Sequence, residues 1–172
     1  GKGRQGKSWS EAPVGQAMYL SVLFHSMKIS DMGLLPLLCG LATARSLGAA
    51  ARIKWPNDVL LGEKKVCGIL TEMSMEQGYI HHIVIGVGIN VRKQEFPEEI
   101  RDRAAAIDEQ CGFRISRSQL IADIMEAFEE DYEIFLRTHD LKGLRASYAE
   151  LLVNQDREVC VLDPKGEYRG IA

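Results

Sequence analysis

The stretch Lys54–Glu72, KWPNDVLLGEKKVCGILTE, carries the groups with the clearest chemical potential. Lys54, Asn57, Asp58 and Lys65 place ammonium, amide and carboxylate groups around a Pro-Asn-Asp turn and between β-prone runs. A hairpin would bring these groups to one edge of a sheet, where the carboxylate could hold Mg²⁺ and a lysine could contact phosphate. This set suits a metal-bound polyphosphate. The alternative is a polar hairpin tip with a solvated lysine.

A second candidate is the segment Gly1–Trp9, GKGRQGKSW, in which glycines alternate with cations. Glycine lets the backbone approach a ligand closely. Successive backbone N–H groups, with Lys2, Arg4 and Lys7, could surround an anion. Trp9 could stack on an aromatic base. A flexible basic tail or a nucleic-acid-binding patch are the alternatives.

A third candidate follows the apolar run Tyr79–Gly88, which predicts a strand covered on both faces. Gly86 and Gly88 remove side chains near the end of this strand, so a ligand or another backbone is expected to come close there. Asn90 could form two amide hydrogen bonds with an adenine edge. Alternatively, Asn90 closes a turn.

Together, these three stretches resemble the biotin protein ligase family. Gly1–Trp9 is similar to its glycine- and arginine-rich loop. Lys54–Glu72 is similar to its KWPND and K-x-x-G-I-L segments, and Ile85–Val91 to its G-x-G-I-N strand end. The resemblance runs from Gly1 to about Val91 and continues more weakly beyond. Lys2 and Lys7 replace arginines of the family loop, which keeps the charge but loses the bidentate guanidinium fork.

The resemblance implies an ATP-dependent ligase that makes biotinyl-5′-AMP and transfers biotin to a carrier lysine. The carrier would be a biotin carboxyl carrier protein of acetyl-CoA or pyruvate carboxylase. By the same resemblance, Lys65 and Arg4 are catalytic and Asp58 holds Mg²⁺. The expected biotin and adenylate contacts are Gly1, Lys2, Gly3, Arg4, Lys65, Gly68, Ile69 and Gly86. The expected ATP contacts are Trp9, Lys54, Asn57, Lys65 and Asn90.

The pattern of elements predicts an α+β fold. Strands are expected at 18–24, 52–55, 59–61, 65–72 and 79–88, and helices at 34–47, 97–107, 117–136 and 140–152. Ser116 and Gln119 suggest a capping box for the long helix, whose acidic residues, including Asp131, are expected to face solvent. The resemblance implies a mixed, largely antiparallel sheet packed by helices, related to class II aminoacyl-tRNA synthetases. Residues 1–153 would form the catalytic domain and 154–172 the start of an SH3-like β domain.

Composition excludes several protein classes. The 172 residues are 46% hydrophobic with a net charge of −3, so the chain as a whole is not a nucleic-acid binder. The cysteines form no C-x-x-C pair, which argues against zinc and for reduced thiols in a cytoplasmic protein. No run resembles a membrane span or signal peptide. Because the sequence starts inside a motif, we expect a fragment of a longer protein.

Three other functions are open at this stage. A lipoate or octanoyl transferase would share the fold, although the KWPND segment argues against it. A biotin-dependent transcriptional repressor would need an upstream helix-turn-helix, so DNA would be bound only by a domain outside this chain. An inactive homologue is disfavoured because Asp58, Lys65 and Asn90 are all present. A homodimer is also open.

Overall fold

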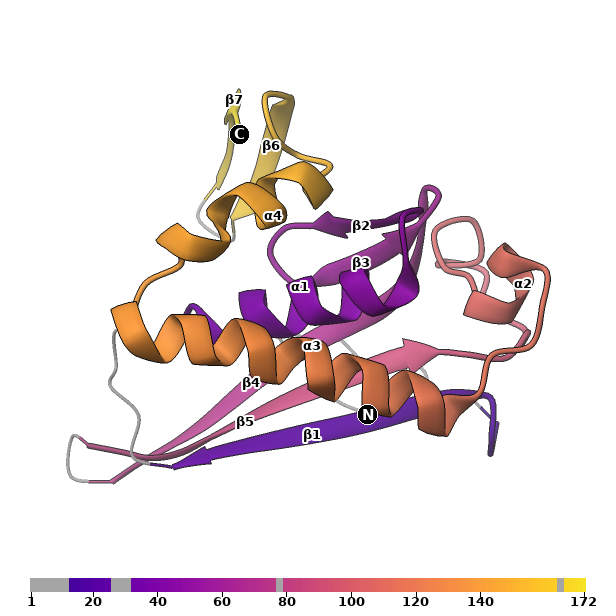
Figure 1. Ribbon diagram of the computed structural model, residues 1–172. Helices are drawn as coiled ribbons and strands as arrows, with labels where there is room; N and C mark the ends of the chain where they lie inside the picture. Colours follow the sequence, from indigo (N-terminus) through magenta and orange to yellow (C-terminus); the bar gives the residue numbers. More distant parts are fainter. Residues whose placement is uncertain (1–12, 26–31, 77–78, 164–165) are drawn as a thin grey trace.

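The computed structural model describes residues 13–25, 32–76, 79–163 and 166–172. Figure 1 shows a sheet with two helices across one of its faces. The strands are β1 (Ala17–His25), β2 (Ala51–Lys54), β3 (Asp58–Leu61), β4 (Lys64–Glu76), β5 (Tyr79–Asn90), β6 (Glu158–Asp163) and β7 (Gly166–Ile171). The helices are α1 (Leu35–Leu47), α2 (Ile107–Cys111), α3 (Arg117–Thr138), the 3₁₀ helix η3 (Lys142–Leu144) and α4 (Arg145–Leu151).

The main sheet has five strands in the order β1-β5-β4-β3-β2. Every neighbouring pair in it is antiparallel. Strands β2 to β5 follow one another as hairpins, whereas β1 pairs with β5 and closes the other edge. The predicted α+β class with an antiparallel sheet is therefore confirmed.

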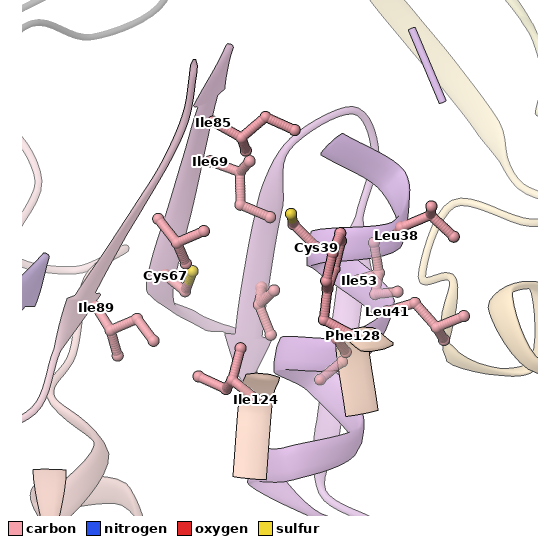
Figure 2. Packing of buried hydrophobic residues seen from close by; sticks show 14 of the residues in the cluster. Leu38, Cys39, Leu41, Ile53, Cys67, Ile69, Ile85, Ile89, Ile124 and Phe128 are labelled. Atoms are coloured by element: carbon pink, nitrogen blue, oxygen red, sulfur yellow. The ribbon is translucent and has the colours of Figure 1, made fainter. Parts of the chain in front are cut away.

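The core lies between the sheet and the pair α1 and α3 (Figure 1). Alternate residues of β5 point into it, namely Ile83, Ile85, Val87 and Ile89. In Figure 2, Ile69 and Ile85 point from the sheet toward α1, and Cys39 points back from the helix. The residues between these on β5 are only half-buried, so the prediction that both faces of this strand are covered is wrong for them.

Helix α3 is held at its start by Ser116, whose hydroxyl accepts a hydrogen bond from Gln119 N–H at 3.3 Å. The side chain of Gln119 donates to Asp123 at 2.8 Å instead of returning to Ser116. The cap is therefore one-sided, and the reciprocal bond of a capping box is absent between these two residues.

Asp131 of α3 corrects the prediction of a solvated acidic face. Its side chain is 1% exposed and accepts a hydrogen bond from Arg45 of α1 at 2.7 Å. Burial raises the pKa of Asp131, and the Arg45 guanidinium opposes that rise. The pair joins the two helices that cover the sheet.

The segment 97–107 is not the predicted helix. Residues 98–103 form turns, Ala104 bridges to Lys65 of β4, and α2 begins only at Ile107. The last predicted helix is divided into η3 and α4. Asp140 accepts a hydrogen bond from Lys142 N–H at 2.9 Å, close to the predicted cap.

The strands β6 and β7 form a separate hairpin. The chain before it is tied to the main sheet because Val153 N–H donates to Ile53 O at 2.9 Å. Within the described parts of the chain, no helix combines the length and apolar character needed to cross a membrane.

Candidate active site on the sheet face away from the helices

Strand register brings one residue from each strand of the main sheet into a line, which we call the site row. Lys54, Asp58, Gly68, Gly88 and Tyr19 are successive Cα partners from β2 to β1. Directly opposed residues project to the same face of a sheet. The side chain of Tyr19 is 58% exposed, so this face, the site face, is turned away from the core.

The adjacent line of residues shows the contrast. Ile53, Val59, Cys67, Ile89 and Met18 are again successive partners across the same strands. All are at most 6% exposed. The period of two along each strand therefore separates the site face from the core.

A β-bulge brings Lys65 to the site face. Val59 opposes Cys67, but the next residue, Leu60, opposes Lys65, so Val66 is the extra residue. In a regular strand, Lys65 would share the core side of Cys67. The bulge shifts the alternation and aims Lys65 toward the side of Asp58, a common use of bulges next to functional sites.

The result is an ion pair between Lys65 Nζ and Asp58 Oδ1 at 2.5 Å. Their side chains are 31% and 24% exposed, so both groups are held in place but remain accessible to a ligand. Cys67 is close in sequence, but it is fully buried and burial raises its pKa. This thiol is therefore not a nucleophile, and the reactive groups of this region are the ammonium and the carboxylate.

A second segment fixes the backbone of Lys65. Its N–H donates to Arg103 O at 2.7 Å, and its carbonyl accepts from Ala105 N–H at 3.0 Å. The bulge is thus bound on the side away from β3 by the distant segment 103–105.

Asn57 binds the turn between β2 and β3 to β4. Its Nδ2 donates to Ile69 O at 3.0 Å, and its backbone carbonyl accepts from Ile69 N–H at 2.9 Å. The turn contains a cis peptide between Trp55 and Pro56. Asn57 therefore supports the position of the neighbouring Asp58.

Glycines form the middle of the site face. Gly68 and Gly88 are in the site row, and Gly86 pairs with Leu70 and Ser21 in the next line. Among the described residues, a Cβ at Gly86 would meet only Leu70 O, at 3.8 Å. The described part of the chain thus leaves room for a side chain at Gly86, as expected where a ligand or another backbone lies on the strand.

Asn90 ends β5, one residue beyond Ile89 of the core line and two beyond Gly88. Strand alternation places it on the site face, although it is only 6% exposed. Gln94 Nε2 donates to Asn90 Oδ1 at 3.2 Å. The predicted strand end at Gly88 was therefore two residues short.

The sequence analysis missed two residues of this region. Tyr19 is in the site row, and Gln94 contacts Asn90. Gly88, which the sequence analysis places beside a ligand or another backbone, is also in the site row. The sequence contains no comparable signal for Tyr19 or Gln94.

Some predicted site residues are not brought to this face. Gly1, Lys2, Gly3, Arg4 and Trp9 lie outside the described residues. The side chain of Ile69 is 3% exposed and packs in the core beneath α1. Its side chain points away from Asp58, so the predicted contact of Ile69 with biotin, which stays a prediction, would have to be made by its backbone.

The described residues hold no group of three His, Cys, Asp or Glu side chains suited to a metal ion. Asp58 is the single carboxylate in the site row. This suits Mg²⁺, which is commonly bound by one or two carboxylates together with substrate phosphates and water.

A family model described as the biotin/lipoate A/B protein ligase family matches residues 1–90, just over half of the chain. The chain belongs to this family. The match includes all five strands of the main sheet and therefore the whole site row.

Individual relatives agree with the family assignment. The chain is 35% identical over 159 residues to the bifunctional ligase/repressor BirA of Bacillus spizizenii, covering 87% of this chain and 48% of the relative. It is 32% identical over 140 residues to BirA of Escherichia coli, covering 78% and 43%. The chain thus spans about half the length of these ligase relatives.

The fold also matches a solved ligase. The biotin protein ligase of Aquifex aeolicus, in complex with biotin and ATP, superimposes with a TM-score of 0.83 at 29% identity. The match covers 98% of this chain and 71% of that one.

Proposed function

We propose that this chain is the catalytic part of an ATP-dependent biotin protein ligase. The observation that carries the proposal is the Lys65–Asp58 pair at 2.5 Å beside a glycine floor on the site face. Ligases of the family match the chain over most of its length, and one of them binds biotin and ATP.

In the first proposed step, a biotin carboxylate oxygen attacks the α-phosphorus of ATP. The bond from that phosphorus to the β-phosphate bridging oxygen breaks, giving biotinyl-5′-AMP and pyrophosphate. Two anions must meet, so fixed positive charge is needed between them. Lys65 is the proposed bridge, because Asp58 and the 103–105 segment hold it in place before substrate arrives.

Asp58 is the proposed ligand for Mg²⁺ brought with ATP. When bound, Mg²⁺ neutralises phosphate charge. Lys54, the cross-strand partner of Asp58, is proposed to lie near phosphate, with Asn57 supporting this edge of the site. Asn90 is proposed to read the adenine edge and Trp9 to stack on its face.

Gly68 and Gly86 are proposed to leave space for biotin. Gly1, Lys2, Gly3 and Arg4 are proposed to bind the biotinyl adenylate, on the strength of the family resemblance. The segment 1–9 would then act as a lid, which such a reaction needs because the mixed anhydride hydrolyses in water.

In the second proposed step, a lysine amine of a biotin carboxyl carrier protein attacks the acyl carbon. The bond to AMP breaks, giving an amide, AMP and a proton. A cytoplasmic location stays a prediction.

The test is biotin-dependent pyrophosphate release by the full-length protein and its Lys65→Met variant. Met keeps the apolar stem of Lys65 but removes the charge, so adenylation should slow by roughly 10²–10³-fold. Lys64→Met is the matched control, because Lys64 opposes Leu61 next to the turn, outside the Lys65–Asp58 pair, and should keep its rate. A wild-type rate for Lys65→Met would overturn the role of Lys65. Lipoate in place of biotin tests the alternative transferase.

A further inference from the structure

Asn90 and Gln94 lie where β5 passes into the loop that follows it. Gln94 Nε2 donates to Asn90 Oδ1 at 3.2 Å, and Asn90 is 6% exposed while Gln94 is half-buried. A side-chain amide has an acceptor end and a donor end, and its hydrogen-bond partners decide which end points where. In this structure, Gln94 therefore engages the acceptor end of the Asn90 amide.

The backbone around the pair is also held. Gln16 O, directly before β1, accepts hydrogen bonds from the N–H groups of Val91 at 3.0 Å and Arg92 at 2.8 Å. The Arg92 guanidinium donates to Asp108 at 2.6 Å, which anchors the loop to α2. The backbone that leads to Gln94 is therefore held by contacts with the end of the sheet and with α2.

This orientation has a chemical consequence for a purine base. With Gln94 bonded to Oδ1, Asn90 keeps a second lone pair on Oδ1 and an NH₂ group, so in this orientation it presents one acceptor and one donor. Adenine presents the N6 amino donor beside the N7 acceptor, whereas 6-oxo purines present O6 and N7, both acceptors. Only adenine matches both ends of the Asn90 amide.

We propose that Gln94 is a positioning residue that sets base specificity: it orients the Asn90 amide so that adenine is accepted and 6-oxo purines are rejected. This inference rests on the proposed function, in which Asn90 reads the adenine of ATP. Gln94 acts through Asn90 and does not itself need to touch the nucleotide.

Gln94→Glu in the full-length protein tests the proposal. A carboxylate accepts but does not donate, so the Asn90 NH₂ should turn toward the introduced carboxylate and present Oδ1 where N7 lies. Biotin-dependent pyrophosphate release is measured with ATP and with ITP. We expect wild type to prefer ATP, and Gln94→Glu to lower the ATP-to-ITP ratio of kcat/KM by about 5- to 150-fold.

Using a ratio separates orientation from charge and from folding. The added negative charge repels ATP and ITP equally. Any loss of folded protein also lowers both kcat/KM values by the same factor, so neither effect changes their ratio. Gln110→Glu makes the same charge change at an exposed glutamine of α2 and should leave the ratio unchanged. Gln94→Met, which removes the donor without adding charge, should lower the ratio less, and it replaces Gln94→Glu if that variant does not fold.

Equal losses for ATP and ITP in the Gln94 variants would overturn this inference while leaving the ligase assignment standing. The same holds if wild type uses both nucleotides equally. Wild-type protein that releases no pyrophosphate in response to biotin would overturn the proposed function, and this inference with it.

Discussion

Gly86 is a residue whose type is better explained by ligand binding than by the stability of the fold. Among the described residues, a Cβ at this position meets only Leu70 O at 3.8 Å, an ordinary van der Waals distance. Glycine inside a strand costs backbone entropy relative to alanine, by roughly 0.5–1 kcal/mol. The absence of a side chain here is thus explained by a ligand better than by packing.

We therefore expect Gly86→Ala to keep or slightly raise the melting temperature while weakening biotin binding. The extra methyl would stand on the floor proposed for biotin, and overpacking of about 1–3 kcal/mol corresponds to a Kd about 5- to 150-fold higher. Calorimetric titration with biotin measures the loss. Gly170→Ala in β7, where a Cβ would meet nothing within 4 Å, is the control. Unchanged biotin affinity would remove Gly86 from the site.

At the scale of elements, two asparagines that bind the turn between β2 and β3, one within it and one from the segment after α4, are used in opposite ways. Asn57 uses its donor, since Nδ2 bonds Ile69 O at 3.0 Å. Asn154 uses its acceptor, since its Oδ1 receives Trp55 N–H at 3.1 Å. Replacement by aspartate keeps the shape of both side chains but removes only the donor.

Asn57→Asp should therefore be harmful and Asn154→Asp tolerated. In Asn57→Asp the introduced carboxylate would face the carbonyl of Ile69, and a lost hydrogen bond with an unsatisfied partner costs about 1–3 kcal/mol. Because Asn57 supports Asp58, kcat for adenylation should fall together with stability. Thermal unfolding and pyrophosphate release give the two readouts. Equal tolerance of both substitutions would contradict this account of the turn.

The contact between α1 and α3 depends on the buried Asp131. We expect Arg45→Met to destabilise the protein by about 1–3 kcal/mol, because it leaves this carboxylate without its guanidinium partner. Arg137→Met, which removes an exposed pair with Glu133 at 3.6 Å, should change stability little.

The effect should depend on pH. Burial raises the pKa of Asp131, so the carboxyl binds its proton more tightly in the folded protein than in the unfolded chain. Stability from such a group is complete at low pH and is lost as the pH rises through the folded pKa. Without Arg45 that pKa rises further, so the deficit should be smaller at about pH 4 than at about pH 7 in denaturant titrations. A deficit independent of pH would exclude Asp131 as its source.

Predictability from the sequence depended on how local each signal was. The strands and the turn around Asp58 were readable, because alternation and turn residues act over a few positions. The burial of Asp131 was also readable in principle, since it is three residues after Phe128 and four before Phe135, on the apolar stripe. The prediction of a solvated Asp131 rested on its charge and not on its position in the stripe.

Other features had no local signal. The segment 97–107 has a proline suited to a helix start. However, Ala104 of this segment forms a β-bridge with Lys65, which is far away in sequence. The bulge at Val66 likewise depends on pairing with β3. The site face could therefore be predicted as a set of residue types, whereas the aim of Lys65 required the three-dimensional pairing.

For the molecule as a whole, the hairpin β6–β7 should contribute little to stability. Every residue of β7 is exposed, and an isolated two-stranded hairpin is marginally stable. We propose that the catalytic domain ends near residue 153. A chain ending at Asp156, which retains the Asn154 contact, should still unfold cooperatively, with a loss of about 1 kcal/mol or less. Loss of the cooperative transition in circular dichroism would show that the hairpin belongs to the catalytic domain.

The site row also sets fixed distances between the groups on the site face. Its residues follow one another across the strands, so their spacing is the distance between hydrogen-bonded strands, about 4.8 Å. From Lys54 to Tyr19 that makes four steps, or about 19 Å. Substitutions can change which side chain occupies each position of the site row, but the positions themselves are set by backbone hydrogen bonds. Evolution can therefore retune this face for a different ligand of similar length more readily than for a longer one, which would require another strand.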